Sequence, residues 1–261
     1  MFVEIADPHD PRLAEFRLPE RGLANRADKR DDAGAGLFLA EGDLVAERAL
    51  EAGCRPYLAL ADGDNLKPVT HALAEQIDVF LGGADVRRFV TGLGMPQPIV
   101  ALFHRPPRPT AAELVARCER LVVVEGVDNP ANVGGIVRNA AGLGWDGLLL
   151  DLASADPFAR RALRVAMGTT FTLPHARTRD LSGVLAAAEG IELLALTPDP
   201  AAVDIREVRA AGRRAVLIGS ERAGLSTGVL AAATPVRIPM SGGVDSLNAA
   251  AATAVACFAL R

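Results

Sequence analysis

The sequence predicts an α/β protein with mainly parallel sheets, and three observations support this fold class. Apolar, β-branched segments alternate with helical segments in both halves of the chain. Half of the 261 residues are hydrophobic and 23% are charged, which is enough apolar material for a sizeable core. Residues 105–110 contain three prolines, which interrupt helices and central strands. We therefore expect a small α/β domain over residues 1–106 and a second domain over residues 107–261.

The first half alternates from strand to helix throughout. We expect strands over residues 37–40, 55–61, 78–81 and 98–103, and helices over residues 44–52, 66–76 and 84–91. This order predicts a mainly parallel sheet covered by helices. Before it lies a charged segment, residues 12–30, with six basic and three acidic side chains.

The second half alternates more strongly. We expect strands over residues 121–125, 147–151, 171–173, 192–197, 214–219 and 235–239. Helices are expected over residues 132–143, 158–167 and 180–188, and a closing helix from about residue 246. Residues 142–147 match the pattern GxGxxG, but they follow a helix and precede a strand, so they predict a helix end and a tight turn.

Composition and charge exclude several classes of protein. The net charge is −4 and the isoelectric point about 5.6, which argues against a nonspecific polyanion binder. Three distant cysteines with no CxxC motif encode neither a zinc site nor a disulfide framework. The first residues lack the apolar run of a signal peptide, and the longest apolar stretch is too short to span a membrane. We expect a soluble cytoplasmic protein without a metal.

The first segment of chemical interest joins the strand at 121–125 to the following helix. Asn132 is expected to cap this helix at its N-terminus. Arg138 lies opposite the apolar stripe of the helix, above the carboxyl edge of the sheet, where open α/β proteins bind ligands. The alternative is that Asn132 is only a cap and Arg138 only a solvated charge.

Two later segments follow the same rule. The strand at 214–219 stops at Gly219, where the backbone can be approached closely, and Glu221 could hold a guanidinium such as that of Arg138. Ser246 and Asn248 stand at the mouth of a closing helix that is almost wholly apolar. An ordinary strand end and simple capping are the alternatives for these two segments.

Together, and in this order, the three segments resemble the three motifs of the SpoU/TrmH-type RNA 2′-O-ribose methyltransferases of the SPOUT class. The resemblance is strong over residues 120–261 and weaker over the first half, where residues 36–42 carry it. The matching positions are Asn132 with Arg138, Gly219–Glu221 with 224–226, and Ile238–Met240 with Ser246, Leu247 and Asn248.

The resemblance implies a C-terminal domain threaded as a trefoil knot, a homodimer, and S-adenosylmethionine as cofactor. It places cofactor contacts at Thr197, Gly219, Ile238, Met240 and Leu247. The catalytic candidates are Arg138, assisted by Asn132, Glu221, Ser246 and Asn248. The reaction would be methyl transfer to a ribose 2′-hydroxyl of ribosomal or transfer RNA.

RNA contacts have to be local, because residues 1–106 carry a net charge of −5 while residues 107–261 carry +1. Within the charged segment the candidates are Arg21, Arg26, Lys29 and Arg30. The rival functions are a noncatalytic RNA-binding or assembly protein built on a methyltransferase scaffold, and a small-molecule methyltransferase. The first rival would be expected to lose Arg138, Glu221 or Asn248, and the second would not need the first domain.

Overall fold

The structure is a computed structural model that describes residues 1–24, 36–92, 94–209 and 211–261. These residues form two compact units. Unit 1 holds the described residues up to Pro107 together with Phe158–Phe171, and unit 2 holds Arg108–Pro157 and Thr172–Arg261. In the part of the chain described here, no helix combines the length and apolar character that a membrane span requires.

Unit 1 is built on a five-stranded sheet of order β1-β4-β3-β5-β2. Its elements are β1 (Phe2–Ile5), the 3-10 helix η1 (Pro11–Arg17), α1 (Glu20–Leu23), β2 (Leu37–Glu41), α2 (Asp43–Glu51), β3 (Pro56–Ala61), α3 (Pro68–Ala74), β4 (Val79–Gly82), α4 (Ala84–Thr91), β5 (Ile99–His104), α7 (Arg160–Ala166) and the 3-10 turn η3 (Thr169–Phe171).

The sheet of unit 1 is mixed, which corrects the prediction of a mainly parallel one. β5 pairs antiparallel with both β3 and β2, whereas β1, β4 and β3 pair in parallel. The sequence pattern missed β1, a strand of four residues. The alternation of strand and helix does not encode the direction of β5, because a helix can precede a strand of either direction.

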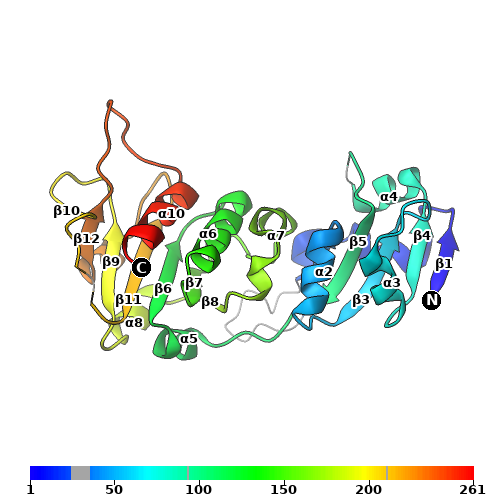
Figure 1. The fold of residues 1–261 in the computed structure, drawn as a ribbon, viewed down its shortest axis with the longest axis horizontal. Coiled ribbons are helices and arrows are strands. Elements are labelled where there is room, and N and C mark those ends of the chain that lie inside the picture. The colour runs from blue at the N-terminus through cyan, green and yellow to red at the C-terminus, as the bar shows by residue number, and fades with distance from the viewer. Residues whose placement is uncertain (25–35, 93, 210) are drawn as a thin grey trace. The chain divides into compact units, whose positions relative to one another are not determined.

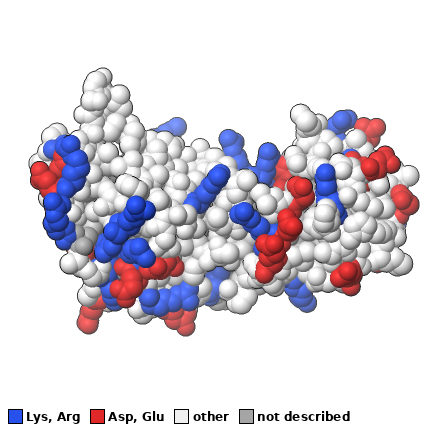
Figure 2. All heavy atoms as spheres, in the orientation of Figure 1, with Lys and Arg blue, Asp and Glu red and all other residues white. Residues whose placement is uncertain are grey.

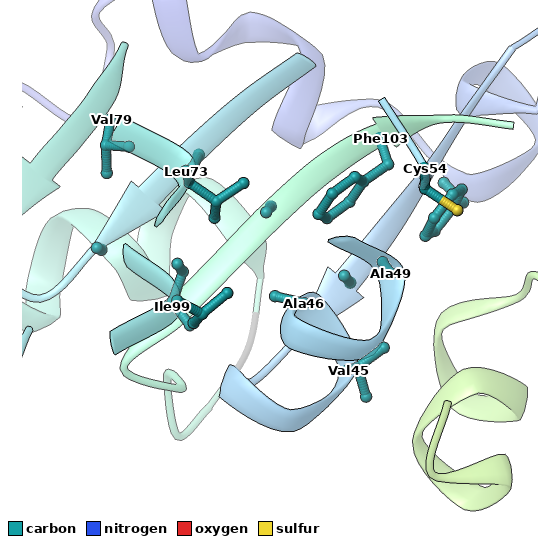
Figure 3. Close-up of a cluster of buried hydrophobic side chains, with 14 of the residues drawn as sticks. Val45, Ala46, Ala49, Cys54, Leu73, Val79, Ile99 and Phe103 are labelled. Carbon is teal, nitrogen blue, oxygen red and sulfur yellow. The ribbon is translucent and has the colours of Figure 1, made fainter. Parts of the chain in front are cut away.

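Each face of this sheet carries its own core. On one face, α2, α3 and α7 pack over the sheet, and Figure 3 shows side chains of β5, α2 and α3 directed into this cluster. On the other face, η1, α1 and α4 pack through Phe16, Leu23 and Val86, respectively. Successive residues of a strand point to opposite faces of the sheet, so each strand contributes side chains to both cores. In β5, for example, Leu102 belongs to one core and Phe103 to the other.

Residues 158–171 lie in the second half of the sequence but belong to unit 1, so the predicted boundary at 106/107 does not separate the two units completely. Phe158 and Leu163 are buried in the core of unit 1, where the ring of Phe158 lies 5.0 Å from that of Phe38. The buried carboxylate of Glu41 pairs with Arg164 at 3.1 Å. Apolar burial and an ion pair therefore fix this segment.

Unit 2 holds a seven-stranded sheet of order β10-β12-β9-β11-β6-β7-β8, and every pair in it is parallel. Its elements are α5 (Ala111–Arg117), β6 (Arg120–Glu125), α6 (Pro130–Gly142), β7 (Gly147–Asp151), β8 (His175–Thr178), α8 (Leu181–Ala186), β9 (Glu192–Leu196), β10 (Val203–Asp204), β11 (Arg214–Gly219), α9 (Thr227–Ala231), β12 (Thr234–Arg237) and α10 (Ala249–Ala259).

Helices cover both faces of the parallel sheet, and Figure 1 shows α6 and α10 side by side on one of them. On the other face α5, α8 and α9 pack over alternate strand residues such as Leu121, Val123 and Leu217. The predicted α/β fold with a parallel sheet is confirmed. The strand predicted at 171–173 is wrong, since Phe171 is the last residue of η3, residues 172–174 belong to no strand, and β8 begins at His175. The trefoil knot stays a prediction, because strand order alone does not define how the chain is threaded.

Candidate functional site

The three motifs of unit 2 meet at one edge of the parallel sheet. β6, β11 and β12 all run in the same direction, so the loops that follow them emerge together at their carboxyl ends. The first loop leads into α6, the second into α9 and the third into α10. Segments about 90 residues apart in the chain are neighbours for this reason, as the hydrogen bond between Asn132 and Glu221 shows.

A chain of three polar side chains joins the motifs. The amide of Asn132 donates to the carboxylate of Glu221, and its carbonyl oxygen accepts from Asn248 Nδ2 at 2.9 Å. Asn132 is buried, with 9% of its surface exposed. Because a buried amide needs partners for both its donor and its acceptor, this network fixes the relative positions of α6, the loop after β11 and the start of α10.

The predicted capping role of Asn132 is wrong. α6 begins at Pro130, and its N-cap is Asn129, whose side chain accepts from Ala131 N at 3.0 Å. Asn132 lies in the first turn, where its side chain is free to reach Glu221. The dipeptide Asn129-Pro130 was the signal for this start, because proline favours the first helical position and asparagine the preceding one.

Arg138 lies on the exposed side of α6, as predicted. Within the described ranges, it has no hydrogen bond or ion pair with another residue. The interpretation that Glu221 holds its guanidinium is not supported, because the partner of Glu221 is Asn132. The structure therefore joins Asn132, Glu221 and Asn248 by hydrogen bonds, and among the described residues Arg138 takes no part in this network.

A cavity of about 760 Å³ opens beside this network. Two of the catalytic candidates, Glu221 and Ser246, line it. So do all five residues predicted to contact a cofactor: Thr197, Gly219, Ile238, Met240 and Leu247. Its volume lies within the range of about 300–1,000 Å³ that is usual for small-molecule sites. The structure thus brings these sequence candidates to one concave surface.

Part of the wall of this cavity is bare backbone at Gly219. A Cβ atom there would lie 2.1 Å from the carbonyl carbon of Gly224 and 2.3 Å from Leu225 N, distances that no side chain can accommodate. The turn is closed by a hydrogen bond from Gly224 N to Ser220 O at 3.0 Å. Gly219 is therefore required for close approach of two backbone segments.

The start of α10 is fixed by residues that the sequence analysis only partly identified. Asn248 is its N-cap and accepts from Ala250 N at 3.0 Å, so the helix begins three residues later than predicted. Asn139 of α6 donates to Ala250 O at 2.7 Å. A methyl group on Gly135 would lie 2.8 Å from Ala250 Cβ, which shows how closely α6 and α10 approach. Asn139 directly follows Arg138 in the first segment, but the sequence analysis gave it no role, because its contact depends on how α6 and α10 pack.

One charged group that lines the cavity, Arg237, is held by its neighbours. Arg237 donates to Ala202 O at 3.2 Å and lies 3.9 Å from the carboxylate of Asp204. Hydrogen bonds from Arg206 lower the pKa of Asp204 to about 2. Asp204 is therefore ionised throughout the physiological range and keeps Arg237 at the rim.

The predicted RNA contacts cannot be placed. Arg26, Lys29 and Arg30 lie outside the described residues, and of Arg21 only the backbone, in α1, is described. Among the residues whose placement is described, no group of three His, Cys, Asp or Glu side chains could hold a metal ion.

Comparison with known proteins defines the class to which this fold and site belong. A sequence model described as the SpoU rRNA Methylase family matches residues 119–258, which is more than half of the chain and contains all three motifs. The chain belongs to the SpoU rRNA Methylase family, and it is an RNA methyltransferase of that family.

Three relatives span nearly the whole chain. A protein of Mycobacterium bovis named as an uncharacterized tRNA/rRNA methyltransferase is 38% identical over 264 residues, which cover 98% of this chain and 90% of the relative. The 23S rRNA (guanosine(2553)-2′-O)-methyltransferase RlmP of Bacillus subtilis is 27% identical over 89% of this chain and 92% of its own length. The AdoMet-bound rRNA methyltransferase of Sinorhizobium meliloti superposes with a TM-score of 0.83 at 26% identity, covering 100% of this chain and 97% of the other.

Proposed function

We propose that this protein transfers a methyl group from S-adenosylmethionine to a ribose 2′-hydroxyl of a structured ribosomal or transfer RNA. The observation that carries the proposal is the side-chain network Asn132–Glu221–Asn248, which unites the three motifs beside the cavity. The names of RlmP and of the Sinorhizobium meliloti enzyme support the position of methylation and the methyl donor, respectively.

The cavity fits this cofactor in size and in the character of its wall. It is about 760 Å³ and combines apolar side chains, such as Ile238 and Leu247, with exposed backbone at Gly219. We assign Thr197, Gly219, Ile238, Met240 and Leu247 to cofactor contacts, mainly through backbone groups. When bound, the cofactor supplies a methyl group already activated by a sulfonium.

The protein's own residues have to align the ribose and ease the loss of the hydroxyl proton. Arg138 is exposed and unpaired within the described residues, so its guanidinium is available to RNA. A guanidinium stays protonated at physiological pH and is a poor base, so Arg138 stabilises the developing alkoxide and grips a neighbouring phosphate. Glu221, Asn132 and Asn248 act by shaping the loops, and Ser246 lies at the cavity where the ribose would enter.

We also propose a homodimer with α10 at the interface. One side of α10 packs on α6 and β11, but Val255 and Phe258 on its other side are 40% and 57% exposed. Two large apolar side chains a helical turn apart suit an interface with a second copy. Sedimentation at micromolar concentration should give about twice 27.3 kDa. Phe258→Glu should shift the protein to the monomer, while the exposed change Arg179→Glu should not.

The proposed reaction is tested by incubating the full chain with radiolabelled S-adenosylmethionine and total RNA from a strain that lacks the gene. A 2′-O-methylated nucleotide resists alkaline hydrolysis, so the label should remain in an alkali-resistant dinucleotide. Label in a base would contradict the proposed position of methylation. A chain that binds RNA and incorporates no label would instead be the noncatalytic scaffold.

A further inference from the structure

Unit 1 contains a pocket that belongs to none of the three motifs. It has a volume of about 500 Å³ and is enclosed by η1, α1, α4 and the first residue of α7. Its floor is formed by buried apolar side chains, among them Phe16, Leu23 and Leu39. Because all of its lining residues belong to unit 1, the pocket is complete within that unit.

An exposed aromatic ring stands at the mouth of this pocket. Phe89 is 49% exposed although α4 buries its neighbours Val86 and Val90. The ring of His9 lies 4.6 Å from that of Phe89 at an interplanar angle of 61°, which restricts the orientation of the phenyl ring. Leaving a phenyl ring exposed to water is energetically unfavourable, so a flat partner that stacks on this ring would bury its apolar surface.

Two arginines supply positive charge at the same pocket. Arg17 is exposed and donates to Pro8 O through Nη1 at 3.0 Å, which leaves other donors of its fork directed to solvent or to a ligand. The Nε atom of Arg160 lies 3.7 Å from the buried carboxylate of Glu41. One acidic group, Glu20, also lines the pocket, and its Oε1 accepts from Arg160 N at 3.0 Å.

We propose that this pocket binds one unpaired nucleotide of the RNA substrate, with the base stacked on Phe89 and a phosphate paired with Arg17. The inference rests on the proposed function and adds a recognition site outside the reacting centre. Sequence-specific RNA recognition uses unpaired bases that stack on aromatic side chains, and a pocket of this volume holds one nucleotide. A base face and a phosphate account for both chemical features of the pocket.

Charge on the face drawn in Figure 2, and the net charge of the first half of the chain, favour a local site of this kind. On the face drawn in Figure 2, basic and acidic side chains are interspersed, and no continuous basic surface is in view. Unit 1 also contains most of the residues of the half with a net charge of −5. RNA affinity in unit 1 therefore has to come from a few placed contacts rather than from a general positive potential.

The test measures binding of the full-length chain to pooled bacterial ribosomal and transfer RNA. Phe89→Ala should weaken binding about tenfold, and Phe89→Trp should restore it, because a stacked base contributes through the ring face. Phe2→Ala is the matched control, since Phe2 is 38% exposed beside His71 but lies outside the pocket. Arg17→Gln should weaken binding, and Arg88→Gln, an exposed change outside the pocket, should not.

Ultraviolet cross-linking of the same complex should attach a nucleotide to residues 89–92 or 16–20. If Phe89→Ala binds RNA as the wild type does, or if no cross-link forms in these segments, the pocket is not an RNA site. Methyl transfer by the wild-type chain separates this result from the proposed function. If the wild type methylates ribose and Phe89→Ala binds RNA normally, the proposed pocket is wrong and the proposed reaction stands. If Phe89→Ala loses RNA binding but the wild type methylates no RNA, the proposed reaction is wrong and the pocket stands.

Discussion

The two sheets of this chain differ in the direction of one strand, and the positions of their candidate sites differ with it. In unit 2 every strand is parallel, so all carboxyl ends lie at one edge, and the loops after β9, β11 and β12 form a single cavity wall. In unit 1 the antiparallel strand β5 interrupts this arrangement, and the pocket is lined mainly by η1, α1 and α4 rather than by loops at the carboxyl ends of strands. Uniform strand direction is what gathers motifs that are distant in sequence.

The largest expected effect comes from changing a core residue, and it tests whether such a change destabilises only the unit that contains it. Leu163→Ala removes a fully buried side chain from the core of unit 1 and should lower the free energy of unfolding by about 2–5 kcal/mol. Hydrogen exchange should speed up in β2 and β5, although residue 163 lies in the second half of the sequence. Leu181→Ala, in the core of unit 2, should instead affect β7 and β8. Identical exchange patterns for both variants would contradict the assignment of residues 158–171 to unit 1.

Next in size is the effect on the reaction itself. Arg138→Ala should lower single-turnover methylation by a factor on the order of 10² while cofactor affinity and stability stay nearly unchanged, because its work belongs to the transition state. Arg138→Lys should rescue poorly, since it lacks the planar fork. The exposed Arg179→Ala serves as a control. A rate within a few fold of the wild type would show that Arg138 is a surface charge.

The comparison also shows what the sequence predicts and what it does not. The parallel sheet of unit 2 follows from the alternation of strands and helices, and the resemblance to the SpoU/TrmH-type enzymes predicted that Gly219, Ile238 and Leu247 gather at one site. The direction of β5, the packing of Phe158 into unit 1 and the contact between Asn132 and Glu221 do not. Each of these depends on which surfaces meet in three dimensions, and a local pattern of hydrophobicity or capping carries no such information.

A smaller effect is expected from the backbone wall of the cavity. Gly219→Ala places a methyl group against the backbone of Gly224 and Leu225, so the loop has to shift. Cofactor affinity should fall about tenfold, because a contact made by fixed backbone is lost. Calorimetric titration with S-adenosylmethionine measures it. Gly142→Ala is the matched control, since nothing lies within 4 Å of the added methyl group, and unchanged affinity in Gly219→Ala would remove this loop from the cofactor site.

The smallest effect separates the two roles of Asn248, which are its hydrogen bond to Asn132 and its capping of α10. Asn248 does two things: its Oδ1 caps α10, and its Nδ2 donates to Asn132. Asn248→Asp keeps a good N-cap but replaces the donor by a carboxylate oxygen, so α10 should remain stable while the carbonyl oxygen of Asn132 loses its partner and faces a second acceptor. We expect a loss of about 1 kcal/mol in stability and a reduction of several fold in methylation. Asn248→Ser also keeps an N-cap, but its shorter side chain does not reach Asn132, so it should have the same effect as Asn248→Asp. If the effects of Asn248→Asp and Asn132→Ala simply add in the double variant, the two residues are not coupled and the motifs are joined by backbone packing alone.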